Sequence, residues 1–423
     1  MSLAFQVWFV LAGGIGLVWL VRLVTIGATL RKRCVLTPDA FHGPLKDAPR
    51  VSILVAARDE EDNIEACITT LLDQDYPNSE LIVVDDRSRD RTPSILARLA
   101  RQFGDRLQVV TVRECPDGWF GKNHAMHNGV AATSGEWLLF SDADCRQTSR
   151  HTLSIAMQES RDHATDFLSI IPVLEHRAVW EKILQPASSL VLINRFLPQR
   201  VNDPKKRIAY ANGAFMLMTR RCYDAIGGHE MVRTRLNEDI DMARLAKQGG
   251  QRLRVVENEG LFQARMYPTL LSAWKGWSRI FAGAFATPSR VLAASAVVFL
   301  FVLAPWISLG VALVRVVWGE SAVAGSWRLA LWTWLVVVTM QQLVITRFYA
   351  AVGFARAWSL TYVLGVSVAL AMLVSALFKV LGATSTTWRS STYRGGRTVR
   401  PSEIAACNPP VRAEPIQEPA SPT

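Results

Sequence analysis

Two aspartates that directly follow an apolar run are the residues whose type and spacing most clearly suggest chemistry. The segment reads Trp-Leu-Leu-Phe-Ser-Asp-Ala-Asp and includes Asp142 and Asp144. Trp137–Phe140 is predicted to form a buried parallel strand, and Ser141–Asp144 the turn that leaves it. Ligands of open α/β sheets bind at such strand ends, and paired carboxylates suit a hard divalent cation that bridges the protein to substrate phosphates. An isolated Asp-x-Asp is also common in structural turns, so the rest of the chain must decide between the two interpretations.

Other charged groups fall where predicted strands end or predicted helices begin. Asp85 and Asp86 close the second strand. Glu238 and Asp239 open a late helix, and Lys122 begins a helix after the loop Asp-Gly-Trp-Phe-Gly. Singly, such a carboxylate is usually a cap or a partner of the helix dipole, and such a lysine is usually solvated. Together on one sheet, these groups predict a site for a nucleotide diphosphate, its metal ion and a catalytic base.

The elements that must position these groups alternate between strands and helices. Apolar runs and helical spacing predict strands over Val51–Ala57, Leu81–Val84, Leu107–Val112 and Glu136–Phe140, with helices over Ile64–Leu72, Thr92–Gln102 and Lys122–Ala132. Past this region we expect strands over Phe167–Ile171 and Gly213–Met218, a polar basic loop over Pro198–Arg207 and a helix over Asn237–Lys247. The alternation predicts an α/β fold with a doubly wound, mostly parallel sheet.

Composition and charge indicate a membrane surface rather than nucleic acid. The chain has 423 residues, half of them hydrophobic, a net charge of +11 and a mean hydropathy of +0.17. Many arginines flank apolar segments, a pattern that favours an anionic membrane surface, so we expect no nucleic-acid partner. The six cysteines are scattered without a Cys-x-x-Cys pair. This argues against a zinc site or a disulfide framework and fits a reducing compartment.

Several apolar segments are long enough to span a bilayer, which takes about 20 residues. They cover Ala4–Ile26, Val291–Trp318, Trp327–Thr346 and Trp358–Leu381. We expect the first to be a retained anchor, because it is too long for the core of a signal peptide. Arg-Lys-Arg follows it at positions 31–33, and the positive-inside rule places the next part of the chain in the cytoplasm.

The later spans create a conflict in this topology. A cytoplasmic catalytic domain followed by three spans places the C-terminal tail outside, yet the arginines of the tail favour the inside. Either one apolar segment is re-entrant or the positive-inside signal fails at this end. Our candidate for the irregular segment is Val291–Trp318, because it contains Pro305 and Arg315.

The segment Pro268–Ala286 is predicted to be an amphipathic helix. Trp274 and Trp277 fall on its apolar face, and Lys275 and Arg279 fall on the opposite face. A Trp-rich face with a basic back suits a helix that lies in the membrane interface, which is our expectation here. The alternative is an amphipathic helix that packs on the protein core.

Four motifs in a fixed order resemble those of family 2 glycosyltransferases with the GT-A fold. They lie in Val51–Glu61, Val83–Asp90, Ser141–Asp144 and Asn237–Asp239, and the similar region runs from about Val51 to Arg279. Within that family, Pro116–Lys122 and Arg265–Tyr267 are similar to the membrane-bound hopene-associated and carotenoid-type lipid glycosyltransferases.

The resemblance implies where a sugar nucleotide binds. Ala57, Asp59 and Glu60 belong to the stretch that would hold its base and ribose. Asp85 or Asp86 would contribute to the same part of the site.

The resemblance also implies the roles of the remaining charged groups. Lys122 would lie near the diphosphate, and Asp144, supported by Asp142, would bind Mg²⁺ or Mn²⁺ on it. Asp239 would be the general base, with Glu238 beside it. A carboxylate at a helix N-terminus stays ionised more readily, which favours this role for Asp239.

Some residues depart from the family pattern. Asp59 stands where the family commonly has Asn, and Arg87 replaces the small residue that often follows the paired aspartates. The Gln-x-x-Arg-Trp motif of processive polysaccharide synthases is missing, and Gln263–Tyr267 has a related composition with shorter spacing and no Trp. A processive synthase, which would also have more spans, remains one alternative. A non-catalytic membrane scaffold is another, but such a scaffold would be expected to lack Asp144 or Asp239.

The prediction is therefore a membrane-bound inverting glycosyltransferase that moves a sugar from a nucleotide-diphosphate sugar to a hydroxyl of a lipid. We expect a multi-pass protein of the cell (inner) membrane with a cytoplasmic catalytic domain. The predicted division is a transmembrane anchor (1–30), a linker (31–50), a GT-A domain (51–267), an interfacial helix (268–288), C-terminal membrane segments (289–382) and a disordered tail (383–423).

Overall fold

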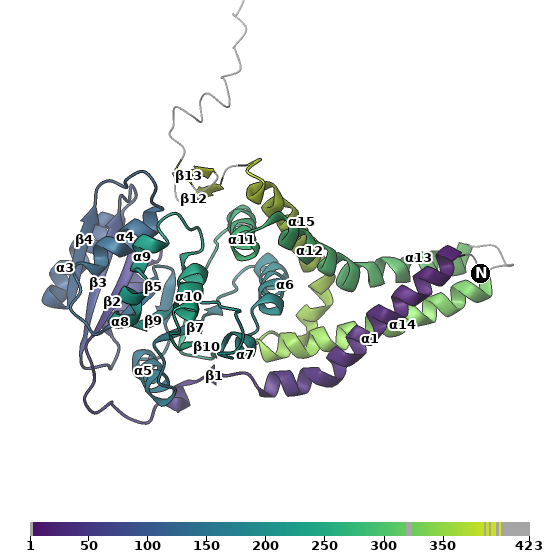
Figure 1. Cartoon of the computed structure of the whole chain (residues 1–423), viewed down its shortest axis with the longest axis horizontal. Helices are drawn as coiled ribbons and strands as arrows, with labels where there is room; N and C mark the ends of the chain where they lie inside the picture. The colour runs from purple at the N-terminus through teal and green to yellow at the C-terminus, as the bar shows by residue number, and fades with distance from the viewer. Residues whose placement is uncertain (1–2, 319–323, 385, 389–390, 395–396, 399–423) are drawn as a thin grey trace, which may run out of the picture.

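A computed structural model describes residues 3–318, 324–384, 386–388, 391–394 and 397–398 (Figure 1). Its centre is an eight-stranded sheet in the order β1-β10-β7-β9-β5-β2-β3-β4. Only β9 runs antiparallel to its neighbours among these strands. The predicted α/β fold with a mostly parallel sheet is confirmed. The strands are β1 (Val35–Leu36), β10 (Leu253–Asn258), β7 (Phe167–Ile171), β9 (Met216–Thr219), β5 (Trp137–Asp142), β2 (Val51–Ala57), β3 (Ser79–Asp86) and β4 (Leu107–Val112).

The central strands are nearly continuous apolar runs because helices cover both faces of the sheet. One face packs against α2 (Ile64–Leu72), α3 (Thr92–Phe103) and α5 (Thr152–Asp162). The other face packs against α4 (Gly121–Val130) and α10 (Glu238–Gln248).

Strand register brings the chemical groups to one edge of the sheet. In β2, Ala57 lies opposite Asp85 of β3, and Ala56 lies opposite Asp142 of β5. Because these strands are parallel, their carboxyl ends meet along one line above the sheet. The predicted strand Gly213–Met218 begins only at Met216, because Gly213 lies in the loop that enters the site.

Smaller elements complete this half of the molecule. A second sheet has the order β6-β11-β8. The predicted loop Pro198–Arg207 starts with the short helix α7 (Pro198–Val201). The remaining elements are β6 (Cys145–Gln147), β8 (Val173–Leu174), β11 (Phe262–Ala264), α6 (Val179–Arg195), α8 (Arg220–Ala225), α9 (Gly228–Met231) and α11 (Leu270–Phe285).

Four helical segments of the described chain are long and apolar enough to cross a membrane. They cover Phe5–Arg31, Pro288–Trp318, Gly325–Ala351 and Arg356–Val380, close to the predicted spans. The helices are α1 (Leu3–Arg31), α12 (Pro288–Val298), α13 (Ala304–Trp318), α14 (Ala324–Ala351) and α15 (Tyr362–Val380). A π-helical turn over Phe299–Leu303 joins α12 to α13, and a 3₁₀ segment over Arg356–Thr361 precedes α15.

The helices α1, α13 and α14 run side by side away from the sheet (Figure 1). Trp8 Nε1 of α1 donates to Ser308 Oγ of α13 at 3.1 Å, and Trp19 Nε1 of α1 donates to the carbonyl of Phe301 in the π-helical turn at 2.9 Å. The bundle is fixed to the sheet at its near end, where Arg33 pairs with Glu257 of β10 and donates to the carbonyl of Ala351.

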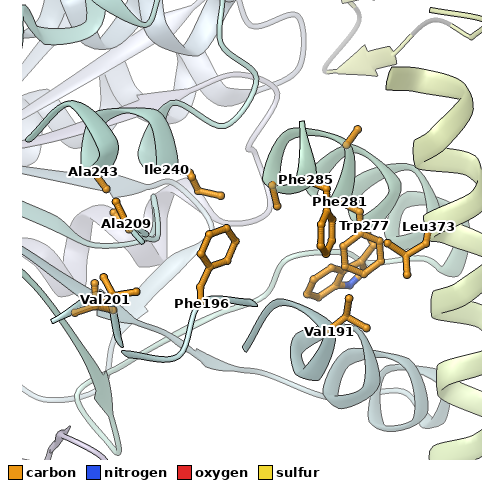
Figure 2. Close-up of a cluster of buried hydrophobic side chains, with 14 of the residues drawn as sticks. Val191, Phe196, Val201, Ala209, Ile240, Ala243, Trp277, Phe281, Phe285 and Leu373 are labelled. Carbon is orange, nitrogen blue, oxygen red and sulfur yellow. The ribbon is translucent and has the colours of Figure 1, made fainter. Parts of the chain in front are cut away.

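The expectation for the amphipathic helix is wrong for its central face. α11 packs that face on protein, and Trp277 is only 3% exposed. Figure 2 shows Trp277 and Phe281 between Val191 of α6 and Leu373 of α15. The indole Nε1 of Trp277 donates to Gln185 Oε1 at 2.9 Å. An apolar face gains as much by burial against other helices as by burial in lipid, so the core-packed alternative holds here.

The expected disordered tail also contains regular structure in its described part. β12 (Thr386–Trp388), β13 (Ser391–Arg394) and β14 (Arg397–Thr398) form an antiparallel sheet. Thr, Trp and Tyr favour strands, which is consistent with this arrangement. The rest of the predicted tail, including residues 399–423, lies outside the described residues.

Candidate active site

Lys122 is the centre of a charged cluster that joins three elements. It stands in the first turn of α4, and its Nζ lies 2.6 Å from Asp142 Oδ1 and 2.6 Å from Glu238 Oε1. Asp142 ends β5, and Glu238 begins α10. Burial disfavours the charge of Lys122, but the two carboxylates outweigh it and raise the pKa of the lysine, which is therefore a fixed cation. We call Lys122, Asp142, Glu238 and Asp239 the Lys122 cluster.

Asp239 is held by backbone groups beside this lysine. Its Oδ2 accepts from the N–H of Gly213 at 3.1 Å, and its Oδ1 accepts from the N–H of Ile240 at 2.7 Å. A Cβ on Gly213 would lie 3.1 Å from Lys122 Nζ and 3.7 Å from Asp239 Oδ2. A larger residue would therefore crowd Lys122, and the sequence prediction missed this position, although Asn-Gly is a recognisable turn signal.

The pKa of Asp239 is raised, contrary to the expectation from its place at a helix start. Burial is the main cause, and the neighbouring charge of Glu238 adds to it. Lys122 and the N–H of Ile240 act in the opposite direction but do not compensate. The helix dipole is a small effect compared with removal of a carboxylate from water. A carboxylate with a raised pKa is a stronger base once it is ionised.

Asp144 follows Asp142 at the end of β5, and both line the same cavity. The described residues contain no group of three or more His, Cys, Asp or Glu side chains that could enclose a metal ion. Two carboxylates beside open space nevertheless fit Mg²⁺ or Mn²⁺, because such ions commonly take one or two protein carboxylates and complete their shell with phosphate oxygens and water. The residues present therefore fit a cation that arrives with a diphosphate.

Asp86 forms a second charged cluster with two arginines at the end of β3. Arg87 Nε and Nη2 donate to the two oxygens of Asp86 at 2.7 and 3.1 Å, and Arg58 Nη1 lies 3.7 Å from Oδ2. Asp85 instead accepts from the N–H of Ser88 at 3.2 Å. We call Asp86, Arg58 and Arg87 the Asp86 cluster.

Asp59 and Glu60 stabilise the loop beside that cluster. Asp59 adopts a left-handed backbone with φ 53°, which Asn and Asp tolerate best, so the exchange of Asn for Asp keeps the loop geometry. Its Oδ1 accepts from the N–H of Arg89 at 2.8 Å. Glu60 accepts from Asn63 Nδ2 at 2.9 Å.

A single cavity of about 830 Å³ brings most of the predicted site residues together. Ala57, Glu60 and Asp86 line one part of it, and Asp144 and the Lys122 cluster line its centre. Asp59 and Asp85 are not among the lining residues. They are hydrogen-bonded to the turn at 88–89 instead.

Comparison with known proteins shows which family has this combination of fold and site. The sequence model of Glycosyl transferase family 2 matches residues 52–227. The chain carries a family 2 glycosyltransferase domain. Two relatives are the 4,4'-diaponeurosporenoate glycosyltransferases of Staphylococcus haemolyticus and Staphylococcus aureus, 24% and 25% identical. The matches cover 57% and 65% of this chain, and 64% and 74% of the relatives.

A solved structure shares the fold of this glycosyltransferase. A mannosyltransferase of Pyrobaculum calidifontis, in complex with GDP-Man and Mn²⁺, superposes with a TM-score of 0.52 at 20% identity over 89% of this chain and 99% of that one. The GT-A architecture is thus confirmed, and the family model and the named relatives confirm the predicted glycosyltransferase domain. The predicted likeness to carotenoid-type enzymes agrees with the names of the relatives.

The cavity of the glycosyltransferase continues from the carboxylates to the membrane helices. Its far arm is lined by Gln185 of α6, Phe348 of α14, and Phe354 and Trp358 of the segment that leads to α15. Gln185 is 3% exposed. Sequence reasoning did not predict this arm, because its walls come from segments more than 150 residues apart.

Two basic residues also lie in this arm. Lys182 Nζ sits 5.4 Å from the centre of the Trp358 ring. His176 packs edge-on against Phe354, and its Nε2 is buried with no hydrogen-bond partner among the described residues. Burial lowers the pKa of His176 to about 4, so its ring is neutral at physiological pH.

Proposed function

We propose that this protein is an inverting glycosyltransferase that moves a sugar from a nucleotide-diphosphate sugar to a hydroxyl of a membrane lipid. One observation carries the proposal. A single cavity joins the carboxylates of the sheet edge to the ends of the membrane helices. A donor that is soluble in water and an acceptor that resides in the bilayer can therefore meet in one enclosed space.

The Asp86 side of the cavity is the proposed place of the donor's base and ribose. Ala57, Glu60 and Asp86 supply backbone and carboxylate groups there. Asp59 and Asp85, which were expected to contact the donor, are proposed to position this loop instead. Lys122 lies between this region and the carboxylates, where it can approach a diphosphate.

Asp144, supported by Asp142, is the proposed ligand of Mg²⁺ or Mn²⁺. The mannosyltransferase of similar fold holds Mn²⁺ together with GDP-Man, which supports this assignment. When bound, such a cation neutralises negative charge that develops on the departing diphosphate.

Asp239 is the proposed general base, with Glu238 beside it. The carboxylate takes the proton of the acceptor hydroxyl as that oxygen attacks the anomeric carbon. The bond from this carbon to the diphosphate breaks on the opposite face, so the configuration inverts. A positioned base typically contributes about 10²–10⁴-fold. The backbone N–H groups of Gly213 and Ile240 orient the carboxylate. Neither group accepts the proton, which stays on Asp239.

A lipid acceptor is supported by the far arm of the cavity. Phe348, Phe354 and Trp358 offer apolar surface next to the helices that we assign to the membrane. The relatives named diaponeurosporenoate glycosyltransferases also suggest an acceptor of lipid type. A polysaccharide synthase is less favoured, because the chain lacks the Gln-x-x-Arg-Trp motif.

The proposed location is the cell (inner) membrane, with the catalytic domain in the cytoplasm. Basic residues gather at the end of the helix bundle that meets the sheet: Arg31, Lys32, Arg33, Arg347 and Arg356. The positive-inside rule favours the cytoplasmic side for such an end.

The test is incubation of membranes that contain the full chain with a panel of labelled sugar nucleotides, followed by partition of the product. We expect label in the organic extract that depends on donor, divalent cation and enzyme. The Asp239→Asn variant is the matched control. Label recovered only in water-soluble oligosaccharide would overturn the lipid acceptor and favour a polysaccharide product.

A further inference from the structure

Helix α15 is apolar and long enough to be a membrane span, but its neighbours belong to the catalytic half of the molecule. It has 19 residues, which correspond to about 29 Å of helix. It packs along α6, α11 and α12, whereas α1, α13 and α14 pack on one another. In Figure 1, α12 and α15 lie across the base of the bundle rather than along it.

The contact between α15 and α6 is a close backbone approach. A Cβ on Gly365 would lie 2.3 Å from the carbonyl oxygen of Ile183 and 2.9 Å from Ala187 Cβ. Farther along α15, Leu373 lies beside Trp277, and Lys379 Nζ donates to the carbonyl of Lys275 at 3.4 Å. The helix is therefore docked on α6 and α11 along most of its length.

The residues of α6 and α11 make a crossing orientation costly. α6 carries Lys182 at the cavity and the buried Glu181, and α11 carries Lys275 and Arg279. If α15 crossed the bilayer, these helices would enter the hydrocarbon with it. Each charged side chain at that depth costs about 2.5–3.5 kcal/mol or more.

The outer face of α15 has the composition of a surface that contacts lipid. Its exposed stripe consists of uncharged residues at helical spacing: Leu360, Leu364, Ser367, Ala371, Val374, Phe378 and Leu381. The neighbouring α12 exposes Leu292 and Val297, 54% and 55% accessible. This apolar surface is continuous with the bundle through the π-helical turn at Phe299–Leu303.

We infer that α12 and α15 lie within the leaflet on the catalytic side, and that the chain crosses the membrane three times, through α1, α13 and α14. The partner of the exposed stripe is thus one leaflet of the bilayer. Residues that directly follow α15, such as Ala383, then lie on the same side as the sheet. This resolves the conflict with the positive-inside rule, because α15 no longer counts as a crossing. The predicted irregular segment, Val291–Trp318, would itself be divided at the π-helical turn between an in-plane α12 and a crossing α13. The inference does not depend on the proposed reaction.

Cysteine labelling in sealed vesicles of one orientation tests the crossing number. The starting protein is the full chain with Cys34, Cys115 and Cys407 replaced by serine. Single cysteines are then introduced as Ser94→Cys on α3, Gly325→Cys at the start of α14, and Ala383→Cys after α15. Ser94 and Ala383 are exposed, and a Cβ on Gly325 meets no atom within 4 Å.

A membrane-impermeant maleimide should label Ala383→Cys together with Ser94→Cys, and Gly325→Cys only in vesicles of the opposite orientation. Labelling of Ala383→Cys together with Gly325→Cys would overturn the inference, because α15 would then cross. Labelling of all three positions from one side would overturn it as well, since the bundle would not cross.

Spin labels measure the depth of α15 directly. Leu364→Cys, Ala371→Cys and Phe378→Cys lie on the exposed stripe and span 14 residues. A crossing helix would give depths that differ by about 21 Å along its axis. We expect nearly equal, shallow depths at the three positions, measured from relaxation by oxygen and by a water-soluble nickel chelate. A graded profile through the midplane would refute the in-plane orientation.

Discussion

The Asp86 cluster and the Lys122 cluster both place carboxylates at the ends of parallel strands, but their charge balance differs. In the first, one carboxylate faces two guanidinium groups. In the second, one ammonium group faces Asp142 and Glu238, with Asp239 close by. The first cluster carries an excess of positive charge and the second an excess of negative charge when all groups are ionised. Two sites with the same position in the fold are thus suited to different tasks.

The difference explains why the proposed reaction needs a cation at one cluster only. A diphosphate is repelled by three carboxylates unless positive charge is added, whereas it needs no such help near two arginines. Burial raises the pKa of Asp239, and the negative charge of Glu238 adds to this effect. The same arrangement therefore favours both metal binding and a strong base.

The largest expected effect is at Asp144. Asp144→Ala should abolish transfer, because the remaining carboxylate of Asp142 is already paired with Lys122. Activity and Mn²⁺ affinity should be measured together, with circular dichroism to show that the protein is folded. Asp162→Ala, at an exposed position at the end of α5, is the matched control. Undiminished activity of the parent in excess chelator would contradict the metal role.

The next effect in size is at Asp239. Asp239→Asn keeps the shape and the contact to the Gly213 N–H but removes the basicity, so the rate of transfer should fall by about 10²–10⁴-fold. Donor binding, measured by calorimetry, should stay within a few-fold of the parent. Asp241→Asn on the same helix is the control, since Asp241 pairs with Arg244. If Asp239→Asn turns over at nearly the parental rate, another residue is the base.

A smaller effect is expected at the Asp86 cluster. Asp86→Asn should raise the KM for the donor by about tenfold, which corresponds to about 1.4 kcal/mol, with little change in kcat. The reason is that Asp86 lines the part of the cavity that we propose for the base and ribose of the donor, apart from the proposed base Asp239. Asp85→Asn tests whether the neighbour acts only through the turn at Ser88, in which case thermal stability should fall more than donor affinity. Equal loss of kcat and kcat/KM in Asp86→Asn would place this residue with the Lys122 cluster instead.

The smallest effect concerns pH. Asp239 must be ionised to accept a proton, and its raised pKa means that activity is lost, as pH falls, at a higher pH than for an ordinary aspartate. Glu238→Gln removes a negative neighbour and should lower that pKa, so the acidic limb of the kcat profile should move to lower pH. If the pKa of Asp239 falls by about one unit, its ionised fraction at acidic pH rises by at most tenfold. The gain in activity of Glu238→Gln at acidic pH should therefore stay below that factor. A limb that moves to higher pH would show that Glu238 acts mainly through Lys122.

Much of the sheet and the position of its chemical groups could be predicted from the sequence. The strands Val51–Ala57, Leu107–Val112 and Phe167–Ile171 have the predicted bounds, because short apolar runs flanked by turn residues are a local signal. Asp142 and Asp144 were placed correctly at a strand end for the same reason. Parallel pairing then brings such ends together without further information from the sequence.

The features that the sequence did not determine depend on contacts between distant segments. An apolar helix face predicts burial, but it does not indicate whether lipid or protein will cover the face. The burial of Trp277 on α6 and α15 was therefore decided by the tertiary structure. The packing of α15 on α6 depends in the same way on a glycine, Gly365, that lets the two helices touch. The pKa of Asp239 depends on Lys122 and on burial, which outweigh its favourable position at a helix start. Local sequence patterns thus determined which chemical groups stand at the strand ends and helix starts. Long-range packing determined the burial and the charged neighbours of these groups, because the free energies of burial and of charge depend on residues that are remote in sequence.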